Sequence, residues 1–241
     1  MKRMIALLLA LGMFAALIGC TEQPAAPAAT PTPVATEEPA PTEEPAPTEE
    51  PVKVLTYAEY AAAELESAVV VETYVQDKQG WWEKDGMGVA TFYTQDEEGG
   101  YFLYNMPCDK EAYDELVPGT KIRVSGYKTA WSGEVEIVDS AFEVLEGSYV
   151  AEPVDATALL GTEELINKQN MLVCFTGMKV VEPALYNWDG SGEVGSDLYL
   201  KLEKDGAEYT FCVESYLRGE DTETYQAVEA LKAGDTVVSS A

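Results

Sequence analysis

The feature that most limits what this chain can fold into is a proline-rich segment over residues 21–52. The segment consists almost entirely of Pro, Ala, Thr and Glu, and Thr-Glu-Glu-Pro-Ala-Pro occurs from Thr36 and again from Thr42. It has too few apolar side chains to offset the conformational entropy lost on folding, and its prolines favour extended polyproline II backbone. We therefore expect a disordered stalk here and a folded part confined to residues 53–241.

A short apolar stretch precedes the stalk and ends at a cysteine. Lys2 and Arg3 come before an apolar run over residues 4–18. The run has the length of a signal-peptide core and is shorter than the roughly 20 apolar residues of a membrane span. Its last residues, Leu17-Ile18-Gly19-Cys20, resemble the lipobox of bacterial (Gram-positive-type) surface lipoproteins, although Ile18 is a less usual residue at its position.

This resemblance implies where the protein works. Residues 1–19 would be removed as a lipoprotein signal peptide, and Cys20 would become the lipidated N-terminus of a stalk over residues 20–52. Because two acyl chains give durable attachment where one gives marginal binding, we expect an extracytoplasmic protein anchored to the cell membrane by its N-terminal lipid. An ordinary secretory signal with an accidental cysteine and a short membrane anchor are the alternatives.

The charge of the chain bears on its partners. There are 43 Asp and Glu against 15 Lys and Arg, with no His, which gives a net charge of −28 at pH 7. Nucleic-acid binding is driven largely by Lys and Arg that neutralise phosphates, so this charge disfavours nucleic acid as a partner. The absence of His also removes the commonest general base and metal ligand.

The folded part predicts a mainly β protein with short helices, in two units over residues 53–148 and 149–241. Runs rich in β-branched and aromatic residues predict strands at 68–76, 88–95, 100–106, 121–128, 134–145, 171–181, 197–203, 207–216 and 236–239. Capping residues and helical spacing predict short helices at 56–65, 109–116, 163–167 and 222–231. The two halves share this order of elements.

Three strands, a helix and two strands follow one another in the first unit, an order that resembles the OB-fold, a five-stranded Greek-key barrel. The resemblance implies tandem OB-fold-like barrels, and some other small β-barrel or sandwich is the alternative. The second unit stops where the first still has about twenty residues to complete its last two strands. We therefore expect an incomplete second barrel, with an exposed or borrowed sheet edge, and a truncated reading frame.

The OB-fold resemblance also directs attention to the tryptophans. OB-folds bind ligands on the face of their second and third strands and in the adjoining loops. The predicted ligand loops carry Trp81, Trp82, Trp131, Trp188 and Tyr186. Aromatic rings at such positions can stack on a saccharide or a peptide side chain, and the alternative is that they fold back and plug the barrel ends.

No catalytic pattern and no cofactor is indicated, so we expect a binding protein rather than an enzyme. The acidic loop at 187–197 resembles a calcium loop only faintly, since Leu198 stands at the position of the last ligand, and we expect no metal. Cys108, Cys174 and Cys212 are an odd number at wide spacing, which favours buried free thiols and leaves one disulfide open.

Four functions follow from these observations, in descending order. The first is a non-catalytic module that binds a saccharide or peptide outside the cell. The second is a structural or assembly module that contacts other envelope proteins. The third, nucleic-acid binding, rests on fold analogy alone, and an enzyme comes last.

Overall fold

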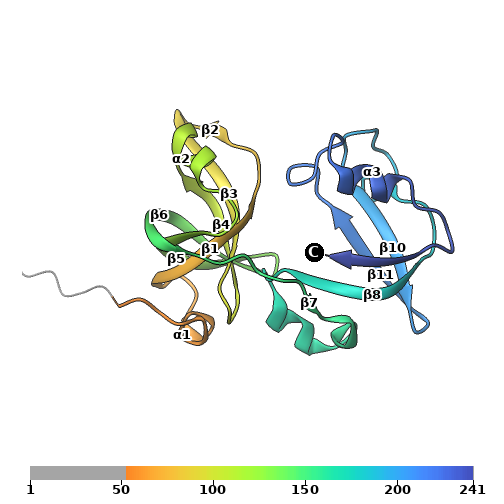
Figure 1. The fold of residues 1–241 in the computed structure, drawn as a ribbon, viewed down its shortest axis with the longest axis horizontal. Helices are drawn as coiled ribbons and strands as arrows, with labels where there is room; N and C mark the ends of the chain where they lie inside the picture. Colours follow the sequence, from red (N-terminus) through yellow and green to blue (C-terminus); the bar gives the residue numbers. More distant parts are fainter. Residues whose placement is uncertain (1–52, 241) are drawn as a thin grey trace, which may run out of the picture. The chain divides into compact units, whose positions relative to one another are not determined.

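The computed structural model describes residues 53–240, which form a closed β-barrel and a second, open barrel, each with short helices (Figure 1). The predicted signal peptide, the predicted lipidation site Cys20 and the predicted stalk lie outside the described residues. Over residues 53–240 no helix has the length and apolar character needed to cross a membrane. The prediction of a mainly β fold with short helices and OB-fold-like barrels is confirmed.

The first barrel contains six strands and two α-helices. In chain order they are α1 (Tyr57–Ala62), β1 (Ala68–Lys78), β2 (Trp82–Lys84), β3 (Met87–Gln95), β4 (Gly100–Pro107), α2 (Lys110–Glu115), β5 (Thr120–Trp131) and β6 (Glu134–Ser148). The short strand β2 is the one element that the sequence pattern did not predict. It forms a hairpin with β3 around Asp85-Gly86, both of which adopt positive φ angles.

The order of the strands defines an OB-fold. The sheet runs β1-β5-β6-β4-β3-β2, and an additional pairing of β1 with β3 closes it into a barrel. Residues Ala68–Tyr74 of β1 pair with β5, whereas Tyr74–Lys78 pair with β3. The strands β4 and β6 are parallel, with Phe102 opposite Glu136. With α2 between the third and fourth barrel strands, this is the five-stranded Greek-key arrangement expected from the element order.

Alternation along each strand produces the core of this barrel, because successive side chains of a strand point to opposite faces. On β1 the buried positions are Val69, Val71, Thr73 and Val75. Side chains from every barrel strand meet them in one cluster, and its fully buried members include Val71, Phe92, Leu103, Ile122 and Ile137. The barrel is therefore filled by apolar side chains.

The helix α1 lies against this barrel and begins and ends at specific contacts. The side-chain oxygen of Thr56 accepts a hydrogen bond from the backbone nitrogen of Glu59 (3.3 Å), and the Glu59 carboxylate accepts one from the Thr56 nitrogen (3.0 Å). This capping box satisfies N–H groups that have no partner within the helix. At the other end, the buried Lys128 Nζ donates to the carbonyl oxygens of Tyr60, Ala61 and Ala63 at 2.7–2.9 Å.

The second barrel has the same order of elements with four main strands. They are β8 (Val173–Val180), β10 (Leu198–Lys204), β11 (Ala207–Val213) and β12 (Thr236–Ser240), with α3 (Glu223–Glu229) before the last. Short elements accompany them: β7 (Val154–Asp155), β9 (Leu185–Tyr186) and the 3-10 helices η1 (Thr157–Leu159) and η2 (Glu163–Lys168). The predicted helix at 163–167 is thus a 3-10 helix.

The sheet order of the second barrel is β11-β10-β8-β12. In the first barrel, β6 lies between the strands that correspond to β11 and β12. Among the described residues of the second barrel, no strand occupies that position. Its core is formed by a separate cluster that includes Phe175, Met178, Leu200 and Leu202. The truncated reading frame that we expected stays a prediction.

Candidate functional site

The outer face of β3 and β4 is the surface on which an OB-fold binds its ligands. Ala90 and Phe92 of β3 point into the core cluster, so the alternating residues Val89, Thr91, Tyr93 and Gln95 point outward. On β4, Tyr101 and Leu103 are in the core, and the intervening Phe102 and Tyr104 point outward. We call the outer surface formed by these outward residues of β3 and β4 the β3–β4 face.

Three aromatic rings form a continuous row on the β3–β4 face. The ring centroids of Tyr93 and Phe102 are 5.1 Å apart, and those of Phe102 and Tyr104 are 6.3 Å apart with an interplanar angle of 28°. Tyr104 is 45% exposed, whereas Phe102 is 6% exposed. The row therefore has one ring that is open to solvent and one that is covered.

The sequence analysis did not select these three residues. The alternation in Thr91-Phe92-Tyr93 and in Tyr101-Phe102-Leu103-Tyr104 was visible in the sequence. It places Tyr93, Phe102 and Tyr104 on the face opposite to Phe92 and Tyr101. That alternation was the signal that could have identified the row. Our selection was confined to the aromatic residues of the predicted ligand loops and so missed it.

Trp82 and Trp131 lie at opposite ends of the β3–β4 face. Trp82 is on β2, opposite Val89, which in turn pairs with Pro107 at the end of β4. Trp131 is opposite Glu134 at the tip of the β5–β6 hairpin, and β6 reaches the middle of β4 at Phe102. Both rings are exposed, Trp82 at 46% and Trp131 at 75%. An exposed tryptophan therefore lies at each end of the β3–β4 face.

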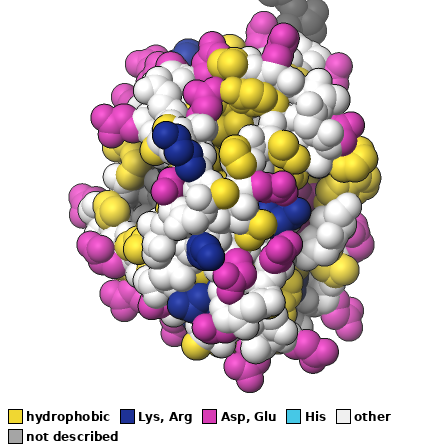
Figure 2. All heavy atoms as spheres, turned by 90° about the vertical axis from the view of Figure 1, so that its right-hand side faces the viewer, with side chains coloured by type: hydrophobic (Ala, Val, Ile, Leu, Met, Phe, Trp, Pro, Cys, Tyr) yellow, Lys and Arg dark blue, Asp and Glu magenta, His cyan; other side chains and the backbone are white. Residues whose placement is uncertain are grey.

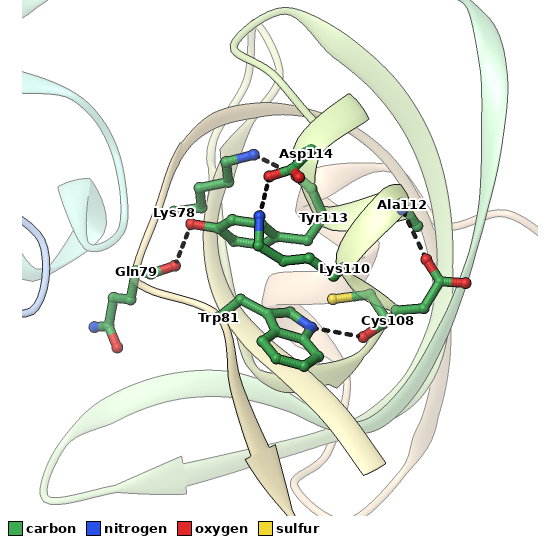
Figure 3. Close-up of polar contacts among 9 residues, drawn as sticks. Lys78, Gln79, Trp81, Cys108, Lys110, Ala112, Tyr113 and Asp114 are labelled. Carbon is green, nitrogen blue, oxygen red and sulfur yellow. Dashed lines mark hydrogen bonds and ion pairs between the residues drawn. The ribbon is translucent and has the colours of Figure 1, made fainter.

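Trp81 points the other way and is part of the barrel wall. Its Nε1 donates a hydrogen bond to the carbonyl oxygen of Cys108 at 3.0 Å (Figure 3). Its ring lies so close to Gly88 that a Cβ atom there would be 2.6 Å from the indole, and it packs against the core cluster. Trp81 therefore follows the alternative that we left open, a ring that plugs the barrel end.

Residues around Trp81 connect the barrel end to the β3–β4 face. The Tyr113 hydroxyl donates to the carbonyl oxygen of Gln79 at 3.0 Å, and the Lys78 ammonium lies 4.0 Å from the centre of the Tyr113 ring (Figure 3). The Gln79 side chain in turn donates to the Tyr93 hydroxyl at 3.2 Å. The Tyr93 ring is thus held at one end of the aromatic row by a hydrogen bond from the loop after β1.

Trp188 and Tyr186 belong to the second barrel and so are not part of the β3–β4 face. Trp188 is 76% exposed in the loop between β9 and β10. The Tyr186 hydroxyl donates a hydrogen bond to the Glu229 carboxylate on α3, which raises the pKa of Tyr186 to about 12. Tyr186 is therefore engaged with a helix of its own barrel, whereas the Trp188 ring is open to solvent.

Carboxylates dominate the electrostatics near the β3–β4 face. Burial raises the pKa of Glu134, and the neighbouring charges of Glu214 and Glu136 raise it further. The pKa of Glu136 is also raised by burial. On the side of the second barrel, which Figure 2 faces, Asp and Glu side chains are also more widespread than Lys and Arg side chains.

The acidic loop of the second barrel uses its carboxylates internally. Asp189 accepts a hydrogen bond from the Ser191 nitrogen at 3.0 Å, and Asp197 accepts two from Ser215, at 2.8 Å from the nitrogen and 2.7 Å from the hydroxyl. Between residues 53 and 240 no group of three or more Cys, Asp or Glu side chains is arranged to hold a metal ion. These contacts give the loop a structural role in its own fold.

The three cysteines of the described residues are free thiols. Cys108 is buried, and burial raises the pKa of its thiol to about 11. Cys174 is partly buried and Cys212 is exposed, so the expectation of buried thiols fits Cys108 alone. A thiol with a raised pKa is a poor nucleophile at neutral pH.

No family model and no curated protein matches the sequence. Solved structures do resemble the chain. A HINa domain of Ifi202 in complex with 20-base-pair double-stranded DNA is 12% identical, with a TM-score of 0.33 over 61% of this chain and 77% of that one. A murine DNA-binding protein bound to double-stranded DNA is 12% identical, with a TM-score of 0.34 over 70% and 83%.

A third similar structure is a replication protein A heterotrimer bound to single-stranded DNA, which is 12% identical, with a TM-score of 0.30 over 62% of this chain and 39% of that one. At this identity the likeness concerns the fold alone. The strand order of the first barrel is what establishes that fold here.

These structures nevertheless go against two of our predictions. We expected a saccharide, a peptide or an envelope protein as the ligand and regarded nucleic acid as a disfavoured partner. The three structures described above are complexes with double-stranded or single-stranded DNA. The second prediction rested on the net charge of the whole chain, and we retain neither prediction.

Proposed function

We propose that the first barrel binds single-stranded nucleic acid on the β3–β4 face. The observation that carries this proposal is the row of Tyr93, Phe102 and Tyr104 rings, with Trp82 and Trp131 exposed at its two ends. Successive aromatic rings on an OB-fold face can accept successive unpaired bases, because every base has a flat face to stack. A duplex keeps these faces stacked on one another, so the proposal applies to single strands.

In this proposal the binding energy comes mainly from bases that stack on aromatic side chains. Each base stacked on an aromatic side chain contributes about 1–3 kcal/mol to binding. Tyr104 and the two exposed tryptophans are open to a ligand as the structure stands. Three such contacts suffice for measurable affinity without base-specific hydrogen bonds, and we expect little sequence preference.

The shortage of free positive charges limits the affinity for nucleic acid. The lysines nearest the Trp82 end are Lys84 on β2, Lys78 at the end of β1 and Lys110 on α2. Lys110 is paired with Asp114, and the Lys78 ammonium donates to the Tyr113 carbonyl oxygen. With few free cations and a net charge of −28, the protein neutralises few phosphates, and we expect modest affinity.

The location of this activity rests on the N-terminal sequence. We propose that Cys20 carries the lipid anchor and that the residues after it hold the barrels outside the cytoplasmic membrane. The ligand would then be extracellular nucleic acid, and the role one of binding rather than catalysis. The lipobox-like Leu17-Ile18-Gly19-Cys20 supports this proposal.

Fluorescence anisotropy with a labelled 12-nucleotide oligothymidylate tests the function. We expect binding by the wild type and little binding of a 12-base-pair duplex. Tyr104→Ala should weaken binding of the single strand about 5- to 150-fold, the equivalent of one lost stacking contact. Tyr127→Ala, which removes a similarly exposed ring from β5, is the matched control and should change nothing.

Two results would reject the proposal. One is the absence of binding by the wild type at protein concentrations up to the millimolar range. The other is equal binding by the wild type and Tyr104→Ala, since a ligand held elsewhere would not respond to this ring.

A further inference from the structure

The β3–β4 face is partly covered, although its residues point away from the barrel core. Val89 is 3% exposed, Phe102 is 6% exposed and Gln95 is 3% exposed. None of them belongs to either core cluster. Val89 lies between Trp82 and Pro107 of the neighbouring strands, whereas Tyr93 and Gln95 make contacts with residues from outside the first barrel.

Residues beyond the first barrel, both before β8 and after β11, contact this face and its border. Both barrels belong to a single compact unit, and three contacts join the later residues to the β3–β4 face and its border. The Tyr93 hydroxyl donates to Glu214 Oε2 at 3.2 Å, the Arg218 guanidinium pairs with Asp77, and the Leu172 nitrogen donates to Gln95 Oε1 at 2.7 Å. Glu214 and Arg218 thus attach the two ends of one short segment.

This segment has its own local structure. The carbonyl oxygen of Glu214 accepts hydrogen bonds from the nitrogens of Leu217 (3.0 Å) and Arg218 (2.8 Å), so the chain turns tightly between its two points of attachment. Tyr216 at the middle of the turn is 75% exposed. The turn can therefore move as a unit if the contacts at Glu214 and Arg218 are released.

We propose that the segment Glu214–Arg218 is an inhibitory strap, which occupies the Tyr93–Phe102 end of the β3–β4 face and must leave before nucleic acid can use the whole aromatic row. This inference rests on the proposed function. The Tyr93 hydroxyl accepts a hydrogen bond from Gln79 and donates one to the Glu214 carboxylate, an acceptor of the kind that a ligand would offer.

The charge of the strap acts in the same direction. The Glu214 carboxylate lies near Glu134, whose pKa is raised by burial first and by Glu214 and Glu136 next. A third carboxylate on this side of the face repels a phosphate backbone. When the strap leaves, that repulsion falls and the Phe102 ring becomes accessible, so both changes favour the ligand.

The contacts that hold the strap are weak enough to be released by binding. The Arg218 and Asp77 side chains are 37% and 31% exposed, and partly exposed ion pairs contribute about 0–1 kcal/mol. If only a fraction of the molecules has the strap released, the apparent affinity for the ligand is the intrinsic affinity multiplied by that fraction. Loosening the strap should therefore raise the affinity about 2- to 5-fold.

The test compares the wild type with Glu214→Gln/Arg218→Ala in the full chain, with the 12-nucleotide oligothymidylate as the probe. We expect tighter binding by the double variant. Arg123→Ala is the matched control, because it also breaks an ion pair, with Glu72 and Glu143 on the β1–β5–β6 side of the first barrel, and it should leave the affinity unchanged. Equal binding by the wild type and the double variant would overturn the strap and leave the proposed function intact.

A second measurement needs no ligand. Hydrogen–deuterium exchange of the amides over residues 214–218 should be faster in the double variant than in the wild type, and in the wild type it should become faster when the oligonucleotide is added. Unchanged exchange in the double variant would show that these two side chains do not hold the strap. If no protein binds the oligonucleotide, the proposed function falls and the strap falls with it.

Discussion

The indole nitrogen of Trp81 donates a 3.0 Å hydrogen bond to the carbonyl oxygen of Cys108, and this contact joins the loop after β1 to the residue that precedes the cap of α2. Trp81→Phe keeps most of the ring and removes the donor. Because a buried carbonyl then lacks a partner, we expect a loss of about 1–3 kcal/mol in the free energy of unfolding. Urea denaturation followed by circular dichroism measures this loss.

The adjacent residue is the control for that measurement. Trp82 is 46% exposed, so Trp82→Phe should change the free energy of unfolding by less than about 0.5 kcal/mol. Equal losses in the two variants would contradict the opposite orientations of these neighbouring rings.

The salt dependence of oligonucleotide binding separates stacking from phosphate neutralisation. If at most Lys78, Lys84 and Lys110 contact phosphates, the slope of log K against log salt should be no steeper than about −2. Anisotropy titrations between about 50 and 200 mM NaCl give this slope. A slope of about −5 or steeper would mean that cations elsewhere on the protein hold the strand.

The pH dependence of stability should differ between two glutamates of the first barrel. Burial raises the pKa of Glu136, so its ionisation opposes folding, and this cost is absent below the ordinary pKa and complete above the raised one. Glu136→Gln should therefore raise the melting temperature at pH 7 and leave it unchanged at about pH 4 or below. Thermal denaturation across this pH range measures the difference.

The ionisation of Glu72 should have the opposite effect on stability. Hydrogen bonds from Lys121 and Arg123 lower the pKa of its carboxyl, so its ionisation favours folding above the ordinary pKa, and this contribution is lost as the pH falls through the lowered value. Glu72→Gln should therefore lower the melting temperature at pH 7. A rise in both variants, or in neither, would be inconsistent with these assignments.

Lys128 should be among the most sensitive charged residues of the first barrel. It is 5% exposed, and its three hydrogen bonds go to carbonyl oxygens at the end of α1. Lys128→Met keeps the length of the side chain and leaves these oxygens without a donor, so we expect a loss of about 3 kcal/mol. Lys110→Met, at an exposed ion pair, should cost less than about 1 kcal/mol in the same denaturation experiment.

The lipid anchor can be tested in bacterial cells. Radiolabelled palmitate should enter the wild-type protein, and the protein should be recovered in the membrane fraction. Cys20→Ser removes the thiol that would accept the lipid, so both signals should be lost. Cys212→Ser, at an exposed cysteine of the second barrel, should retain both, and label in the Cys20→Ser protein would reject the anchor.

The order of elements in the first barrel was predictable because its strands carry strong local signals. Val69, Val71 and Val75 alternate with outward residues, and Thr56 and Glu59 identify the start of α1 before any contact is known. The hairpin strand β2 was missed because three residues are too few to show a period of two. The order of the strands in the sheet then followed from the resemblance to the OB-fold.

The site was less predictable. Trp81 and Trp82 are neighbours, and which ring enters the barrel depends on the register of the unpredicted β2 with Val89. Tyr93 and Asp77 are contacted by Glu214 and Arg218, which are more than a hundred residues away along the chain. Local patterns indicate that a residue lies on a face, and only tertiary contacts decide whether that face is open.

The double pairing of β1 has a consequence for the order of folding. The end of β1 pairs with β3, which is close in sequence, but the beginning of β1 needs β5, which itself needs β6 on its other side. Such non-local pairings form slowly because a long loop must close first. A half-barrel of β1, β3 and β4 should therefore form before the rest, and its unpaired edge is open to aggregation until β5 and β6 are in place.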